Sequence, residues 1–185
     1  MRRVMLYTRL MDGEVKCGAM ETQLQPDASG VVRRVVAFDV GERRIGVAVS
    51  DALGYTAQPL LTIYCKTAKA DLKSIGRILR RHGIAEAVVG NPLHMSGEVS
   101  PRARKAEELA GKIQAEFGIP VHLVDERLTT WEAHQLLDES GQSRRTAADR
   151  NKRKRIIDQV AAVLILRSFL EARANERGRE SKMLE

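Results

Sequence analysis

Asp39 is the residue of this 185-residue sequence whose setting most suggests chemistry, because it ends the otherwise apolar run VVAFD at positions 35–39. A carboxylate in an apolar setting is costly unless it is paired, hydrogen-bonded or bound to a metal. One interpretation is an aspartate that starts a turn and accepts hydrogen bonds from the backbone of the next segment, VGERR. The other is a metal ligand at the end of a buried strand. The residue type alone leaves both interpretations open.

Two more acidic residues, Asp125 and Glu126, end the apolar segment VHLV. Side chains alternate across a strand, so these two carboxylates face opposite sides and only one of them can join Asp39. Glu126 has the longer side chain and reaches further, and Asp125 is the other candidate. An electrostatic alternative is that both acids simply favour a helix N-terminus near Thr129.

Asp158 has two interpretations that depend on where the last helix begins. If the helix begins near Ile156, Asp158 is an acid of the first turn and stabilises the helix dipole by about 0.3–1 kcal/mol. If the helix begins earlier, Asp158 lies deeper and shares a stripe with Ala161, Ala162 and Ile165. Small neighbours of this kind would let the stripe pack on a sheet beside Asp39, and we prefer this interpretation.

Strand-like and helix-like segments alternate along the chain and must position these acids. The β-branched runs at 35–39 and 45–50 flank a Gly-containing turn and predict an antiparallel hairpin, and Pro59 predicts that a third strand, 57–64, lies at an edge. The other predicted elements are a helix at 69–82 ended by Gly83, a strand at 86–93, a helix at 101–117, a strand at 121–128, a helix at 129–140 and a last helix at 156–173.

This order predicts an α/β fold: a mixed sheet of about five strands, first an antiparallel hairpin and then parallel strands, with helices on both faces. We divide the chain into a loosely ordered N-terminal extension (1–30), one domain (31–172) and a charged C-terminal tail (173–185). A short strand near residues 5–10 is the only element that the extension suggests.

The chain is basic, with 31 Lys and Arg against 24 Asp and Glu and a pI near 9.7. Such an excess raises the expectation of an anionic partner such as nucleic acid, although many proteins carry it as a solvated surface. Much of the charge lies in residues 141–155, which we predict to be a loop that becomes ordered on substrate. Its basic residues are Arg144, Arg145, Arg150, Lys152, Arg153, Lys154 and Arg155.

The cysteine content and the hydropathy predict a cytoplasmic protein. Cys17 and Cys65 are far apart and have no metal-ligand spacing, which favours a reducing compartment. The longest apolar stretch, 160–166, is too short to span a membrane, and no apolar run follows the first basic residues as it would in a signal peptide.

The order of elements resembles the ribonuclease H-like fold, and four sequence blocks resemble the YqgF family, described both as Holliday-junction resolvases and as pre-16S ribosomal RNA nucleases. The blocks are FDVGERRIGVAVSD, VVGNPLHMSGEVSPRARK, VDERLTTWEA and RIIDQVAAVLILRSFLE. The Asp-Val-Gly motif alone is weak, since sugar kinases and actin-like ATPases use a similar strand–turn–strand to hold phosphate, but four blocks in the right order and spacing are specific. The resemblance covers residues 35–170.

The resemblance implies a metal site of Asp39, Glu126 and Asp158, with Asp125 as the reserve ligand and Arg127 as a partner for phosphate or carboxylate. Three convergent carboxylates repel one another and raise one another's pKa unless cations bind between them, and Mg²⁺ or Mn²⁺ suits oxygen ligands. Related nucleases often carry an acid where this chain has Asn91, so the site has one ligand fewer than a full two-metal site.

The resemblance implies a metal-dependent nuclease that hydrolyses phosphodiester bonds in the 5′-end processing of pre-16S rRNA, with a resolvase of branched DNA as the alternative. A different class is an RNA-binding or scaffolding factor of the same fold; an actin-like ATPase fits poorly because it needs a second related domain. The basic residues from Arg144 to Lys154 would contact phosphate. His94 and Trp131 are open candidates for substrate contact, and His122 and His134 are predicted to be structural.

Overall fold

The computed structural model describes residues 6–9, 15–17, 34–92, 100–125 and 147–183, and all structural statements below concern these ranges. The strands of the predicted core are β3 (Arg34–Val40), β4 (Arg44–Ser50), β5 (Ala57–Tyr64), β6 (Ile84–Asn91) and β7 (Val121–Asp125). In space they lie in the order β7-β6-β3-β4-β5.

The pairing within this sheet confirms the predicted fold class. Strands β3, β4 and β5 pair antiparallel, whereas β3, β6 and β7 run parallel to one another. The strand β5, which contains Pro59, lies at an edge as predicted. Two short strands from the N-terminal extension, β1 (Leu6–Arg9) and β2 (Val15–Cys17), continue the sheet beyond β7, so that it has seven strands rather than about five.

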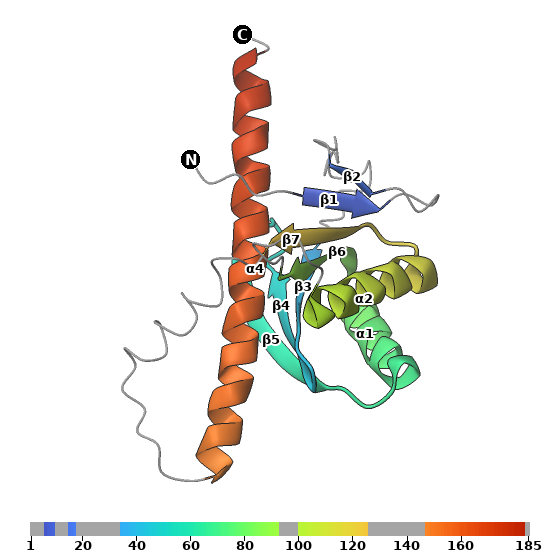
Figure 1. Cartoon of the computed structure of the whole chain (residues 1–185). Helices are drawn as coiled ribbons and strands as arrows, with labels where there is room; N and C mark the ends of the chain where they lie inside the picture. The colour runs from blue at the N-terminus through green and yellow to red at the C-terminus, as the bar shows by residue number, and fades with distance from the viewer. Residues whose placement is uncertain (1–5, 10–14, 18–33, 93–99, 126–146, 184–185) are drawn as a thin grey trace.

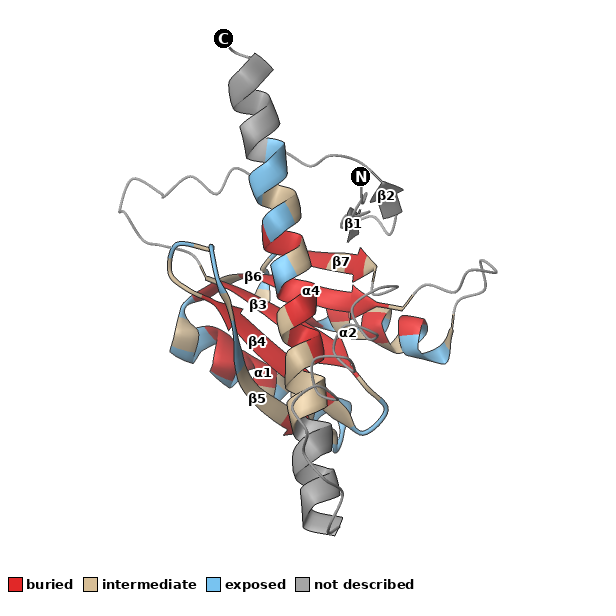
Figure 2. Ribbon diagram, turned by 90° about the vertical axis from the view of Figure 1, so that its left-hand side faces the viewer, coloured by how far each residue is buried: buried red, intermediate tan, exposed pale blue. Residues whose placement is uncertain are grey.

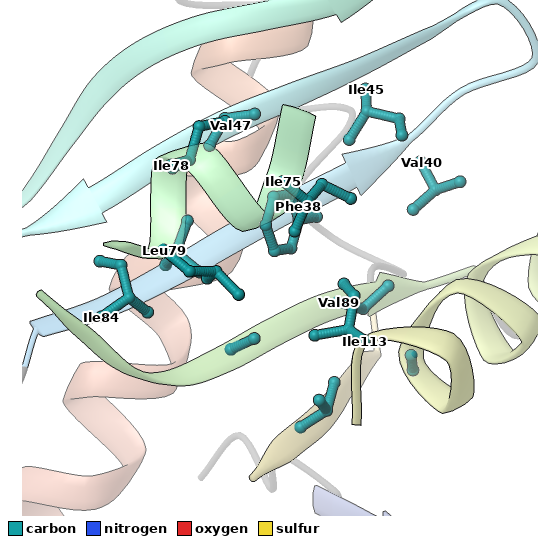
Figure 3. Close-up of a cluster of buried hydrophobic side chains, with 14 of the residues drawn as sticks. Phe38, Val40, Ile45, Val47, Ile75, Ile78, Leu79, Ile84, Val89 and Ile113 are labelled. Carbon is teal, nitrogen blue, oxygen red and sulfur yellow. The ribbon is translucent and has the colours of Figure 1, made fainter. Parts of the chain in front are cut away.

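Helices cover both faces of the sheet (Figures 1 and 2). Helices α1 (Ala68–His82) and α2 (Pro101–Phe117) pack on one face, and the long helix α4 (Ala147–Met183) crosses the other face. Each face has its own apolar core. The core under α1 and α2, shown in Figure 3, includes Phe38, Val47, Ile75, Ile78, Val89 and Ile113, and the core under α4 includes Val35, Ala37, Val88, Val124, Ile165 and Phe169.

Local sequence signals fix the ends of the two shorter helices. The side chains of Thr67 and Ser100 accept hydrogen bonds from the first turns of α1 and α2, and Gly83 and Gly118 end these helices with φ near +60°. Both predicted helices are therefore confirmed almost to the residue.

The last helix begins earlier than predicted. We predicted a loop over 141–155 and a helix over 156–173, but α4 already begins at Ala147 and continues to Met183. The prediction of a loop was wrong for residues 147–155, because Arg and Lys are good helix formers and a run of charge is compatible with a solvated helix. Asp158 is therefore well inside the helix and is not an acid of its first turn.

None of the helices in the described ranges is long and apolar enough to cross a membrane.

Candidate active site

Asp39 lies near the end of the central strand β3 and faces helix α4. The alternation along β3 shows this, because Val35 and Ala37 belong to the core under α4 whereas Val36 and Phe38 belong to the opposite core. The residue is only 7% exposed. Burial raises the pKa of its carboxyl group to about 6, the guanidinium of Arg102 opposes this rise, and the negative charge of Asp158 adds to it.

Asp158 is brought to this carboxylate by a close backbone contact. Gly46 on β4 pairs directly with Asp39. A Cβ atom built on Gly46 would overlap the backbone carbonyl oxygen of Asp158 and would lie 3.2 Å from its Cβ. Only a residue without a side chain therefore lets α4 lie directly on the backbone of β4 at this point, which places the two acids on the same side of the sheet.

Each of these two carboxylates has an arginine partner. The Nε atom of Arg44, the first residue of β4, donates a hydrogen bond of 2.6 Å to Oδ2 of Asp158. A guanidinium nitrogen of Arg102, in the first turn of α2, lies 3.5 Å from Oδ1 of Asp39. The negative charge of the pair is thus balanced within the protein itself.

The turn between β3 and β4 is tied to helix α2. The Nζ atom of Lys105 donates hydrogen bonds to the backbone oxygens of Gly41 and Glu42, at 3.1 and 2.7 Å. The turn is closed by a bond from Gly41 N to the oxygen of Arg44. These contacts hold the start of α2, and with it Arg102, against the end of β3 that carries Asp39.

The two polar residues at the ends of β6 and β7 belong to the other face. Asn91 and Asp125 are paired in register. Val121 and Leu123 pack in the core under α1 and α2 and Val124 under α4, so alternation assigns Asp125 to the face opposite Asp39. Asn91, 3% exposed, follows Ala87 and Val89 on that same opposite face, and its Oδ1 atom has no hydrogen-bond partner within the described ranges.

Comparison with known proteins assigns the chain to a family. The family model described as "RuvX: Holliday junction resolvase" matches residues 33–172. The chain belongs to the RuvX family. Two of its relatives bear the name "Putative pre-16S rRNA nuclease": one from Moorella thermoacetica, 46% identical over 138 residues (75% of this chain and 94% of the relative), and one from Koribacter versatilis, 44% identical over 151 residues (82% and 95%).

Solved structures that resemble the chain include the Fowlpox virus resolvase in complex with Holliday junction DNA (14% identity, TM-score 0.49, 75% of this chain and 97% of that chain) and Thermus thermophilus RuvC in complex with a Holliday junction (18% identity, TM-score 0.44, 77% and 96%).

Only some of the predicted site residues of this RuvX-family chain lie in the described ranges. The structure brings Asp39 and Asp158 together. Arg150, Lys152, Arg153 and Lys154 lie in the first turns of α4, where only the backbone is described. The other predicted positions lie outside the described residues: Glu126, Arg127, Arg144 and Arg145, together with His94, Trp131 and His134. Within the described residues no three His, Cys, Asp or Glu side chains form a cluster able to hold a metal.

Arg44 was not among the residues that sequence reasoning singled out. It lies inside the block FDVGERRIGVAVSD, next to a second arginine, and the pattern of the strand does not say which of the two faces the acids. Its role follows from its contact with Asp158, a residue far away in the sequence. No local signal could have found it.

His122 lies in a separate buried cluster, which agrees with the prediction of a structural role. It is 4% exposed, its ring packs against Phe169 of α4, and its Nε2 atom is 3.4 Å from Oε2 of Glu86. Arg173 of α4 donates a 2.6 Å hydrogen bond to the same oxygen. Burial would raise the pKa of Glu86, but His122 and Arg173 outweigh burial and hold it below its ordinary value.

Proposed function

We propose that this chain is a metal-dependent nuclease that hydrolyses phosphodiester bonds in the precursor of 16S ribosomal RNA. The observation that carries the proposal is the buried carboxylate of Asp39 beside Asp158, at the end of the central strand of a RuvX-family domain. Relatives 44–46% identical to this chain are named for this activity. The proposal places the protein in the cytoplasm, which the cysteine content also predicts.

A divalent cation fits the donor set of this site. The carboxylates of Asp39 and Asp158 offer the hard oxygen ligands that Mg²⁺ and Mn²⁺ prefer. Burial raises the pKa of Asp39 to about 6, because it destabilises the ionised carboxylate. A cation bound beside this carboxylate would stabilise its ionised form. We propose Asp39 and Asp158 as ligands and Glu126 as the third. Glu126 is preferred to Asp125, the reserve candidate, because alternation along β7 assigns Asp125 to the face opposite Asp39.

Different residues of the chain would bind the cation, exclude water and orient the substrate. A bound cation would activate water and stabilise negative charge on the phosphate. Asp39 and Asp158 would hold it, because one lies in the central strand β3 and the other in helix α4, which packs on the neighbouring strand β4. The apolar core beneath Asp39 excludes water from one side of the carboxylate. Basic side chains near the site then orient the substrate through its phosphates.

Binding of an anionic polymer is supported by the charge of the chain. Arg102 and Lys105 lie in the first turns of α2, next to Asp39 and the turn between β3 and β4. The first turns of α4 carry a second group of basic residues that precede Asp158 on the same helix. We propose that side chains from both groups contact phosphates of the substrate, with the two groups on either side of the catalytic acids.

A resolvase of branched DNA is the second candidate, favoured by the description of the family model that matches this chain. The chemistry at the phosphate would be the same, so only the shape of the substrate distinguishes the two functions. An RNA-binding factor without turnover is the candidate from a different class.

A cleavage panel distinguishes these candidates. The protein is incubated with Mg²⁺ or Mn²⁺ and with precursor 16S rRNA, unstructured single strands or a four-way DNA junction, and products are mapped. Asp39→Asn is expected to abolish cleavage while it leaves RNA affinity intact, whereas Asp71→Asn, a matched change in the first turn of α1, is expected to leave both intact. Preferential cleavage of the junction would favour the resolvase, and tight RNA binding without cleavage by the wild-type protein would favour the binding factor.

A further inference from the structure

The two arginines at the site hold their carboxylates in different ways. Arg44 donates from Nε at 2.6 Å, and only 25% of its side chain is exposed. Arg102 lies 3.5 Å from Asp39, beyond the usual length of a charge-assisted hydrogen bond, and 47% of its side chain is exposed. One contact is short and partly buried, whereas the other is long and open to solvent.

Arg44 is fixed by its position in the sheet. It begins β4, pairs in register with Tyr64 of β5, and its backbone oxygen accepts the hydrogen bond that closes the turn from Gly41. Its Nε atom donates the 2.6 Å hydrogen bond to one carboxylate oxygen of Asp158, Oδ2. An outer hydrogen bond of this type sets the orientation of a metal-binding carboxylate, and its loss typically costs 10- to 100-fold in metal affinity.

The side chain of Arg102 is less constrained by its surroundings than that of Arg44. Its side chain projects from the first turn of α2, where Ser100 caps the helix, and its contact with Asp39 is electrostatic rather than a well-formed hydrogen bond. A guanidinium can bind two oxygens of a phosphate at once, which makes phosphate a stronger partner than one distant carboxylate oxygen. If a cation neutralised Asp39, this contact would lose most of its electrostatic attraction.

We propose that Arg44 is a positioning residue that stays on Asp158, whereas Arg102 is an exchangeable counter-ion that leaves Asp39 when the cation binds and takes a phosphate oxygen of the substrate. This inference rests on the proposed function and deepens it. The charges at the site support this inference. In the free protein the guanidinium groups of Arg44 and Arg102 balance the carboxylates of Asp158 and Asp39. A cation bound to Asp39 would leave Arg102 without its partner, next to the position that the substrate phosphate must occupy.

The test compares Arg44→Gln and Arg102→Gln by two binding measurements that need no turnover. The first is the affinity for Mn²⁺ alone, measured by calorimetry. The second is the affinity for precursor rRNA in the presence of Ca²⁺, measured by fluorescence anisotropy. Arg104→Gln is the matched control for Arg102→Gln, since it removes the same charge from an exposed residue of the same helix turn.

We expect Arg44→Gln to weaken Mn²⁺ binding by at least 10-fold, with Arg44→Lys restoring part of the loss. We expect Arg102→Gln to leave Mn²⁺ binding unchanged or to strengthen it, while RNA affinity and kcat/KM fall about 10-fold or more. Arg104→Gln should change neither affinity by more than 2-fold. Circular dichroism and melting curves establish that each variant is folded, and Arg44→Lys takes the place of Arg44→Gln if the latter unfolds.

Three outcomes would overturn the inference. Equal losses of Mn²⁺ affinity in both variants would make Arg102 a fixed positioning residue, and unchanged Mn²⁺ affinity in Arg44→Gln would remove the role of Arg44. Equal losses of RNA affinity in Arg102→Gln and Arg104→Gln would reduce Arg102 to general surface charge. The proposed function fails separately, if the wild-type protein binds Mn²⁺ and RNA as expected but cleaves no substrate.

Discussion

Gly46 and Asp158 are in backbone contact, although more than a hundred residues separate them: the Cα of the glycine lies so close to the carbonyl oxygen of the aspartate that no Cβ fits between them. Because Gly46 is also the strand partner of Asp39, this contact sets the separation of the two acids. The geometry of the site therefore depends on a residue that has no side chain and takes no part in the chemistry.

Gly46→Ala is expected to push α4 away from β4 and to abolish most of the activity. The new methyl group would meet backbone atoms, which cannot turn aside as a side chain can, so the helix must shift. We expect a loss of about 1–3 kcal/mol in the free energy of unfolding and at least a 10-fold loss of cleavage rate. Urea denaturation and single-turnover cleavage measure the two effects.

Gly54→Ala provides the contrast. Gly54 has a φ of +70°, so alanine is strained there and costs about 1 kcal/mol, but nothing surrounds its Cβ position. The two variants should thus have comparable stability losses and different activities. Full activity in Gly46→Ala would show that α4 needs no backbone contact with β4 at this point.

Asp39→Asn is expected to stabilise the metal-free protein at neutral pH. The pKa of Asp39 is 3.8 in the unfolded chain and about 6 in the folded protein, so between these values the folded state holds a proton that the unfolded state has lost. Stability therefore falls as the pH rises from about 4 to about 6, and the full cost, up to about 3 kcal/mol, remains above pH 6.

The measurement is the difference between Asp39→Asn and wild type in the free energy of unfolding, with a chelator present, at several pH values. We expect a difference near zero at pH 3.5, growth between pH 4 and 6, and a plateau above. A difference that is constant over this range would show that burial does not perturb Asp39.

The sequence predicted the elements better than it predicted their contacts. The predicted hairpin, the edge position of β5 and the two capped helices follow from local signals: β-branched runs, Pro59 and the glycines that end helices. The beginning of α4 did not follow, because a run of Arg and Lys is compatible both with a solvated loop and with a helix, and nothing local decides between them.

For the candidate site, too, local sequence identified some residues and only the structure identified the others. Asp39 was identified from the local sequence, since a carboxylate at the end of an apolar strand is costly unless it is paired, hydrogen-bonded or bound to a metal. Asp158 could be assigned to the site only from the way the distant helix α4 packs on the sheet. Arg44 could be assigned only from its contact with Asp158. Contacts between residues distant in sequence are set by packing of the whole domain, and no local pattern contains them.

Arg173→Met is expected to destabilise the protein by about 3–5 kcal/mol at neutral pH, because it leaves the buried Glu86 without its main partner. The paired Glu86 has a lowered pKa, so its contribution to stability is present above its unfolded pKa of 4.5 and is lost as the pH falls through the folded value. Arg167→Met, which removes an exposed pair with Glu171 on the same helix, should cost less than 1 kcal/mol.

Urea denaturation at pH 7 and pH 4 tests this difference. The penalty of Arg173→Met should shrink at the lower pH, where Glu86 can accept a proton in the variant. Similar penalties for the two arginine variants would mean that the Glu86 cluster contributes no more than a surface pair. Arg173 lies one position beyond the matched family region, so the cluster anchors a part of α4 that is outside it.

The basic residues at the start of α4 are expected to contribute phosphate contacts along one side of the helix. Positions 150, 153 and 154 recur at helical spacing, and 154 and 158 are one turn apart, so this side leads toward Asp158. Each contact with a single strand adds about 0.7 to the magnitude of the log–log salt slope of binding. Replacing Arg150, Arg153 and Lys154 by Gln, which preserves helix propensity, should therefore flatten the slope by about 2.

Lys152→Gln is the internal control, because position 152 falls on the opposite side of the helix and should change the slope by much less than one contact. The rate at saturating substrate should change little in either variant, since these side chains hold the substrate and do not activate water. If the triple variant keeps the wild-type salt slope, this stretch of α4 is only a solvated surface. Phosphate binding must then depend on the first turns of α2, where Arg102 and Lys105 lie beside Asp39 and the β3–β4 turn.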